Sequence, residues 1–69
     1  MIGIVIPPDV RAKAGIPPGA ALGLVSSRPM AFSPQWRMVV CELGDENSRR
    51  WSIADVGYQE MNAWIEAAK

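Results

Sequence analysis

The stretch of the chain that decides the fold is residues 3–22, which read GIVIPPDVRAKAGIPPGAAL. It opens with the β-branched run Ile4, Val5 and Ile6, whose side chains have restricted χ1 rotamers and pack well on a pleated surface. Pro7 follows at once and has no backbone N–H to donate to a neighbouring strand. The pattern therefore predicts a strand that ends at Ile6.

A short helix is predicted over residues 8–14. Pro8 suits the first helical position, because a backbone N–H there would have no partner within the helix, and Asp9 lies at the positive end of the helix dipole. Gly15 marks the end of the helix, since glycine readily adopts the left-handed conformation that closes many helices. Residues 17–19, Pro-Pro-Gly, then predict a turn before a second apolar run.

This order of elements resembles the AbrB-type swapped-hairpin domain of transition-state regulators and antitoxins. The resemblance covers residues 3–24, about a third of the chain. It implies a homodimer whose strands are exchanged between two chains, and DNA binding through Arg11 and Lys13 of the short helix. The sequence departs from the family pattern in two respects. The strand that normally precedes the apolar run is missing, and Gly3 stands where many members carry a basic residue that contacts DNA phosphates.

Length and composition indicate a single small domain, residues 1–69. Hydrophobic residues make up 49% of the chain, which is typical of a folded protein and not of a disordered one. A domain of this length buries only a modest core, and self-association would add to it. We therefore expect a homodimer on physical grounds as well as from the resemblance.

Chemistry-bearing residues are scarce in this chain. The single cysteine, Cys41, excludes a disulfide within the chain, and there is no histidine. We therefore expect neither a metal site nor a cofactor, and we expect Cys41 to be a small buried residue on a strand. Without an imidazole base or an activating neighbour for Cys41, no catalytic residue is assigned. The sequence predicts a protein that is not an enzyme.

Hydropathy and net charge bear on where the protein acts and on which partners it binds. The chain contains no apolar run long enough to cross a membrane, and its first residues lack the basic and apolar regions of a secretory signal. We expect a cytoplasmic protein with no membrane partner. The net charge is zero, whereas nucleic-acid-binding domains are usually strongly basic.

Residues 25–34 contain two prolines and three serines and show no clean period, so we predict a long loop or an irregular edge. Long loops in small domains are often functional, and this one carries Arg28, Met30 and Phe32. Two interpretations stay open. Met30 and Phe32 close one end of the core, or the three residues together form a partner-binding loop.

A β-hairpin is predicted in the second half of the chain. Residues 35–43 alternate between two largely apolar faces, which favours a central strand or a strand at a dimer interface. The polar run 44–48 predicts a turn, and residues 49–54 predict the second strand. Trp36 and Trp51 are expected to lie near each other across this hairpin as a structural aromatic pair.

An amphipathic helix is predicted near residues 58–68, after Gly57, with Ser52 or Asp55 as candidate caps. One stripe of this helix is formed by Met61, Trp64, Ile65 and Ala68. Such a stripe packs on the sheet in an ordinary small domain. Alternatively, Trp64 and its neighbours dock a partner, because tryptophan and methionine are enriched at interface cores.

The predicted fold class is α+β, with a small, mostly antiparallel sheet of three or four strands, the short helix and the C-terminal helix. Two functions stay open. The favoured one is a non-enzymatic regulator of the phage- or operon-encoded inhibitor type, which binds and modulates a larger bacterial protein. Its candidate protein-binding residues are Arg28, Met30, Phe32 and Trp64. The alternative is an AbrB-like DNA-binding regulator or antitoxin, with candidate residues Arg11, Lys13, Arg49 and Arg50.

The swapped-hairpin resemblance generates a test of oligomeric state. Because that arrangement takes its strands from two chains, light scattering at micromolar concentration should return the mass of two chains. The mass of a single chain under the same conditions would contradict it.

Overall fold

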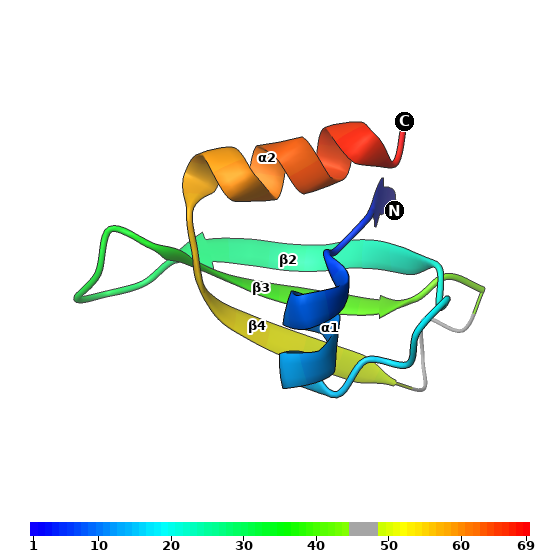
Figure 1. Ribbon diagram of the computed structural model, residues 1–69. Helices are drawn as coiled ribbons and strands as arrows, with labels where there is room; N and C mark the ends of the chain where they lie inside the picture. Colours follow the sequence, from blue (N-terminus) through cyan, green and yellow to red (C-terminus); the bar gives the residue numbers. More distant parts are fainter. Residues whose placement is uncertain (45–48) are drawn as a thin grey trace.

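The computed structural model describes residues 1–44 and 49–69, and within them the chain forms four strands and two helices (Figure 1). In chain order these are β1 (Ile2–Ile4), α1 (Pro8–Ala14), β2 (Leu22–Pro29), β3 (Trp36–Glu42), β4 (Arg50–Val56) and α2 (Tyr58–Ala67). The predicted α+β class, the short helix and the C-terminal helix are confirmed.

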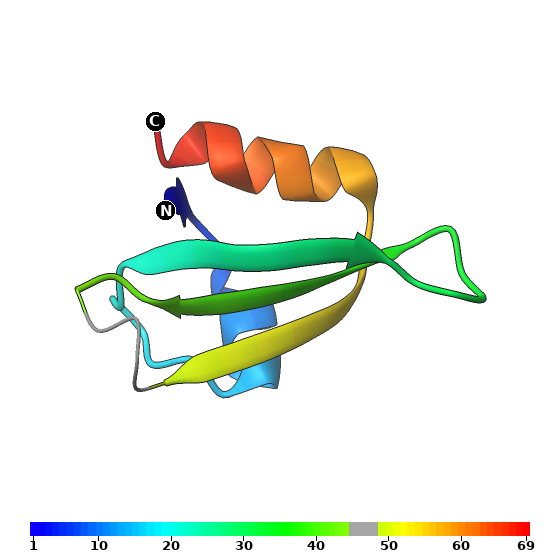
Figure 2. The same ribbon diagram turned by 180° about the vertical axis from the view of Figure 1, so that it is seen from behind.

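The sheet is antiparallel at every pairing, and its strands lie side by side in chain order, β1-β2-β3-β4. In Figure 1, α1 lies in front of β3 and β4, and α2 runs above β2 beside the N-terminal strand. Both helices pack on the same core. We call the sheet face toward this core the covered face. The other, which neither described helix crosses, is the open face (Figure 2).

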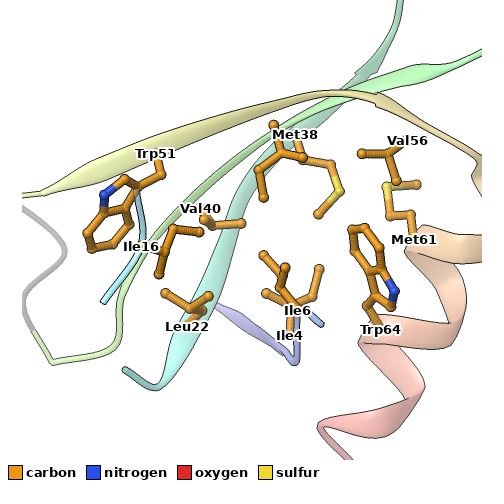
Figure 3. Packing of buried hydrophobic residues seen from close by; sticks show 11 residues of the cluster. Ile4, Ile6, Ile16, Leu22, Met38, Val40, Trp51, Val56, Met61 and Trp64 are labelled. Atoms are coloured by element: carbon orange, nitrogen blue, oxygen red, sulfur yellow. The ribbon is translucent and has the colours of Figure 1, made fainter. Parts of the chain in front are cut away.

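Apolar side chains from the four strands and α2 fill the space between the covered face and the helices (Figure 3), and the partly buried Val10 and Ala14 of α1 pack against them. The buried members are Ile4, Ile6, Ile16, Leu22, Met38, Val40, Trp51, Ile53, Val56, Met61 and Trp64. A backbone hydrogen bond, 3.0 Å from Val5 N to Trp64 O, ties α2 to the chain just after β1. Full burial of one such side chain contributes about 1.5–3 kcal/mol, so this cluster is the main stabilising element.

The local signals around α1 act as predicted. Pro8 occupies the start of the helix, and Gly15 ends it in the left-handed conformation, with φ 78°. The Pro-Pro-Gly turn is closed by a hydrogen bond of 3.4 Å from Ala20 N to Pro17 O, and Gly19 has φ 82°. These two positive φ angles explain why glycine stands at both positions.

Arg11 connects the segments on either side of α1. Its guanidinium donates to three backbone carbonyls: Nε to Ile6 O (3.1 Å), Nη1 to Pro17 O (3.2 Å) and Nη2 to Ala20 O (2.8 Å). The three acceptors belong to the chain before the helix and to the turn after it. Because α1 has only seven residues and such a short helix is marginal alone, these bonds help to hold it against the sheet.

Of the two alternatives predicted for residues 25–34, the long loop is wrong for residues 25–29, and the irregular edge is confirmed there. β2 continues to Pro29 and pairs with β3, and the loop covers only residues 30–35. A register shift between Leu24 and Ser26 interrupts the alternation of side chains, which removed the strand period from the sequence pattern. Pro29 is tolerated because β1 pairs only with residues 22–24, so β2 is an edge strand beyond them.

The predicted proximity of Trp36 and Trp51 is also wrong, although the hairpin of β3 and β4 exists. In an antiparallel pair, the first residues of one strand oppose the last residues of the other. Trp36 therefore lies opposite Val56, and Trp51 lies opposite Val40. The Trp36 ring instead packs near Tyr58, with 5.3 Å between centroids. Of the predicted turn 44–48, residues 45–48 lie outside the described residues.

The start of α2 differs from the predicted caps. Ser52 and Asp55 both belong to β4, and Gly57 is the residue that precedes the helix. Glu60 Oε1 accepts the backbone N–H of Gly57 at 3.1 Å, which satisfies a donor at this end. Neither α1 nor α2, nor any other helix in residues 1–44 and 49–69, has the length and apolar content needed to traverse a membrane.

The contacts of Arg11 predict a stability effect. Arg11→Ala removes three partly buried hydrogen bonds to carbonyls and should lower the free energy of unfolding by about 2 kcal/mol. Urea denaturation followed by circular dichroism measures the change. Lys13→Ala is the matched control, because Lys13 is exposed on the same helix and its truncation should change stability by less than about 0.5 kcal/mol. Equal stability of the two variants would contradict the assigned role of Arg11.

Candidate functional site

The β2–β3 hairpin projects beyond the part of the sheet that the helices cover, as Figures 1 and 2 both show. Its loop, residues 30–35, is closed by a hydrogen bond of 2.9 Å from Met30 N to Gln35 O. A second bond, 3.2 Å from Gln35 N to Ser33 Oγ, lies within the loop. These two bonds therefore hold the backbone of the loop in a defined conformation.

Phe32 is the most exposed large hydrophobic residue of the described chain. Its relative exposure is 103%, whereas the other large exposed hydrophobics, such as Met1 at 63%, keep part of their surface covered. Leaving a phenylalanine in water forgoes about 1.5–3 kcal/mol that its burial would contribute. Single exposed apolar residues are common, but a fully exposed ring at the tip of a projecting hairpin is well placed to enter a pocket on another molecule.

A shallow hollow of about 470 Å³ lies beside Phe32. Its walls are both apolar and basic: Pro29, Met30 and Phe32 supply apolar surface, and Arg28 and Arg37 supply two guanidinium groups. The structure thus brings together three of the four predicted protein-binding residues, Arg28, Met30 and Phe32. The combination of apolar and arginine side chains is typical of protein–protein interface cores.

Arg37 also belongs to this site, although the sequence did not indicate it as a candidate binding residue. It lies directly opposite Arg28 in the pairing of β2 with β3, and both residues are exposed. Like charges directly opposite each other on a sheet are destabilising. Among the described residues, neither arginine has an acidic partner within salt-bridge distance. The signal that could have identified Arg37 is its position as the one cation of β3, between the apolar residues Trp36 and Met38.

The open face of the sheet continues from this arginine pair. Val39 follows Arg37 by two positions and therefore points to the same face, where its partners across the sheet are Ser26 and Ser52. These three small side chains lie on the open face next to Arg28 and Arg37. The hairpin tip and the open face are thus contiguous.

One end of the open face is closed by the chain itself. Cys41 is fully buried there, as predicted, and its Sγ lies 3.3 Å from Met1 Sδ. Met1 and Leu43 pack over Gly23, where an added Cβ would meet Met1 Sδ at 2.5 Å. Around Gly23 and Cys41 the open face is therefore covered by side chains of the protein itself.

Trp64, the fourth predicted protein-binding residue, does not belong to this site. Its relative exposure is 9%, and it packs in the core between α2 and β1 (Figure 3). The amphipathic stripe of α2 faces the sheet, so the bulk of the indole ring is not available to a partner. The packing interpretation of this helix is the one that the structure supports.

The four predicted DNA-binding residues do not form one basic surface. Arg11 uses its guanidinium on backbone carbonyls, and Lys13 is exposed on α1, over the covered face. Arg49 stacks over Trp51, with 5.2 Å from Cζ to the ring centroid. Arg50 is exposed and lies opposite Cys41, which belongs to the open face. Arg50 is therefore on the other side of the sheet from Lys13.

Other candidate sites carry less chemistry. In the described part of the chain, no three side chains of His, Cys, Asp or Glu gather as metal ligands would. A hollow of about 390 Å³ between α1, β4 and α2 has Lys13, Asp55 and Glu60 at its wall. All three residues are exposed, and Glu60 already accepts a backbone N–H. The hairpin with its arginine pair is the stronger candidate.

The chain matches no protein-family model, no curated protein and no solved structure. The resemblance of residues 3–24 to the swapped-hairpin domain therefore stays a prediction. The role of the hairpin rests on its own geometry and chemistry.

Substitution of Trp64 and substitution of Phe32 should have very different effects on the free energy of unfolding. Trp64→Ala removes a core side chain and should lower the free energy of unfolding by about 3–5 kcal/mol. Phe32→Ala removes a fully exposed side chain and should change it by less than about 0.5 kcal/mol. Urea denaturation of both variants measures this. A large loss of stability in Phe32→Ala would mean that the ring packs within the protein.

Proposed function

We propose that this protein is a small non-enzymatic regulator that acts by binding a larger protein partner, and that the β2–β3 hairpin makes the contact. The observation that carries the proposal is the full exposure of Phe32 at the tip of a hairpin with a hydrogen-bonded loop. Bound in this way, the protein modulates or inhibits its partner by occupying part of the partner's surface.

The energetics of interfaces support this assignment. A few residues usually supply most of the binding free energy, and they are apolar anchors or arginines that enter pockets on the partner. Phe32 and Met30 can serve as such anchors, and the adjacent Arg28 and Arg37 add charged contacts. The loop hydrogen bonds reduce the conformational entropy that binding would otherwise cost.

The available surface is adequate for such a role. A standard interface covers roughly 800 Å² on each partner, which is under a fifth of the 4481 Å² surface of this chain. The hairpin tip together with the adjoining open face offers a continuous region for such a contact. Cytoplasmic residence, a bacterial partner and a homodimer stay predictions that belong to this proposal.

DNA binding receives less support. The Arg11 guanidinium is engaged by three carbonyls, and Lys13 and Arg50 lie on opposite sides of the sheet. The net charge of zero gives no strong attraction to a phosphate backbone. We therefore keep DNA binding as an outcome of the test and not as a second proposal.

Site-specific photo-crosslinking tests the proposal. A photoreactive phenylalanine analogue is placed at position 32 and, as a control, at position 13 on α1. In a bacterial lysate treated with nuclease, position 32 should give one dominant crosslinked protein, and position 13 should not. Equal crosslinking at the two positions, or products that disappear with nuclease, would contradict the assignment.

Capture experiments give the matching mutational test. Phe32→Ala should reduce recovery of the crosslinked protein at least about tenfold, the effect of losing one anchor worth 1.4 kcal/mol or more. Val5→Ala is the matched control, because Val5 is an exposed hydrophobic residue away from the hairpin. Unchanged recovery with Phe32→Ala would show that the tip is not the contact.

A further inference from the structure

We propose that Arg28 and Arg37 together bind an acidic segment of the partner, with paired carboxylates seated on the two guanidinium groups. The inference rests on the proposed function and names the chemistry of the surface that the hairpin recognises. Its basis is the juxtaposition of two like-charged arginines across neighbouring strands, beside an exposed aromatic anchor and an open sheet face.

The geometry suits carboxylates. Residues directly opposite on an antiparallel pair have Cβ atoms about 4.5–5.5 Å apart, so the two side chains leave the sheet close together. Each guanidinium presents a planar fork of N–H donors that matches a carboxylate in a bidentate arrangement. Two carboxylates from one segment, or one carboxylate shared by both forks, can occupy the space beside the hollow.

Two of the other three arginines show what an engaged guanidinium looks like here, whereas the third, Arg50, is exposed near the far end of the open face. Arg11 donates to three carbonyls, and Arg49 lies over the Trp51 ring. Arg28 and Arg37, in contrast, form none of the side-chain hydrogen bonds or ion pairs found within residues 1–44 and 49–69. Their donors face solvent, where an incoming anion can reach them.

The pairing also has an energetic consequence. In the unbound protein the two positive charges repel each other across the sheet. An anion placed between them removes this repulsion in addition to forming charge-assisted hydrogen bonds. Both the relief of this repulsion and the new hydrogen bonds therefore make the free energy of binding more favourable.

Charge distribution favours an acidic protein segment over a nucleic acid. A polyphosphate chain responds to the field of the whole molecule, and this chain has zero net charge, with acidic residues such as Asp9, Glu60 and Glu66 exposed elsewhere. Single-stranded nucleic acids are usually held by aromatic platforms. Beside the arginine pair, Phe32 supplies one exposed ring, and the adjoining open face presents Ser26, Val39 and Ser52 in place of further aromatic side chains.

A titration with defined probes tests this inference. The purified protein is titrated near pH 6, where glutamate is ionised, with a synthetic Glu-rich peptide and separately with a single-stranded oligonucleotide of equal charge. The NMR signals of the arginine Nε–H groups are the site-specific readout. The peptide should shift the Arg28 and Arg37 signals, leave the Arg11 signal in place, and bind more tightly than the oligonucleotide.

Variants assign the effect to the pair. The double variant R28Q/R37Q should weaken peptide binding about tenfold or more, through the loss of charge-assisted bonds. R28K/R37K keeps the charge but not the fork, so it should retain only part of the affinity. Lys13→Gln, which removes an exposed cation from α1, is the matched control and should bind as the wild type does. Circular dichroism confirms that each variant is folded.

The outcomes separate the two proposals. Tighter binding of the oligonucleotide, or wild-type peptide affinity in R28Q/R37Q, overturns the inference about acidic segments. If protein capture still depends on Phe32 in that case, the proposed function stands without it. If the peptide binds through Arg28 and Arg37 while Phe32→Ala leaves capture unchanged, the arginine pair stands and the hairpin tip fails as the anchor.

Discussion

The guanidinium of Arg11 is the interaction on which the arrangement of the N-terminal half depends. It joins the end of the first apolar segment to the turn before β2, and so it fixes where the seven-residue helix between them lies. With α1 and α2 both on one face, the core is closed from that side alone. The open face is left to surface residues, and this is why a chain of 69 residues has room for an exposed arginine pair next to its hairpin.

The two aromatic residues Phe32 and Trp64 have different roles because of their positions in the fold. One stabilises the core, and the other is exposed for binding. Trp64 lies on a helix whose apolar stripe meets the sheet, so its ring is enclosed by neighbours. Phe32 lies on a loop that extends past both helices, so no neighbour within the described chain covers it. Hydrophobic character alone does not separate these cases, because both residues are large and apolar in the sequence.

Much of the fold followed from local signals. Pro8 and Gly15 delimit α1, and Gly57 precedes α2, because these residues restrict or permit particular backbone angles wherever they occur. Strand pairing was harder to predict. The relation of Trp36 to Trp51 depends on which residues oppose each other in an antiparallel ladder, and the length of β2 depends on an irregularity that hides the two-residue period. The roles of the site residues were the hardest to predict. The sequence shows that Arg11 and Arg37 are charged. It does not show that Arg11 donates to three carbonyls or that Arg37 lies opposite Arg28.

The register shift after Leu24 has a consequence for how such a site could arise or disappear. Side chains alternate between the faces of a sheet, so one extra residue in a strand reverses the face of every residue beyond it. With the extra residue at position 25, Arg28 lies opposite Arg37 on the open face. If Val25 were instead paired in a regular ladder, Ser27 would lie opposite Arg37, and Arg28 would turn toward Trp36 on the covered face. Loss of the bulge with Val25 retained would therefore dismantle the arginine pair, whereas deletion of Val25 would join Leu24 to Ser26 and keep the pair. Both chains would still contain every arginine, so comparisons of composition between related chains would not reveal the loss.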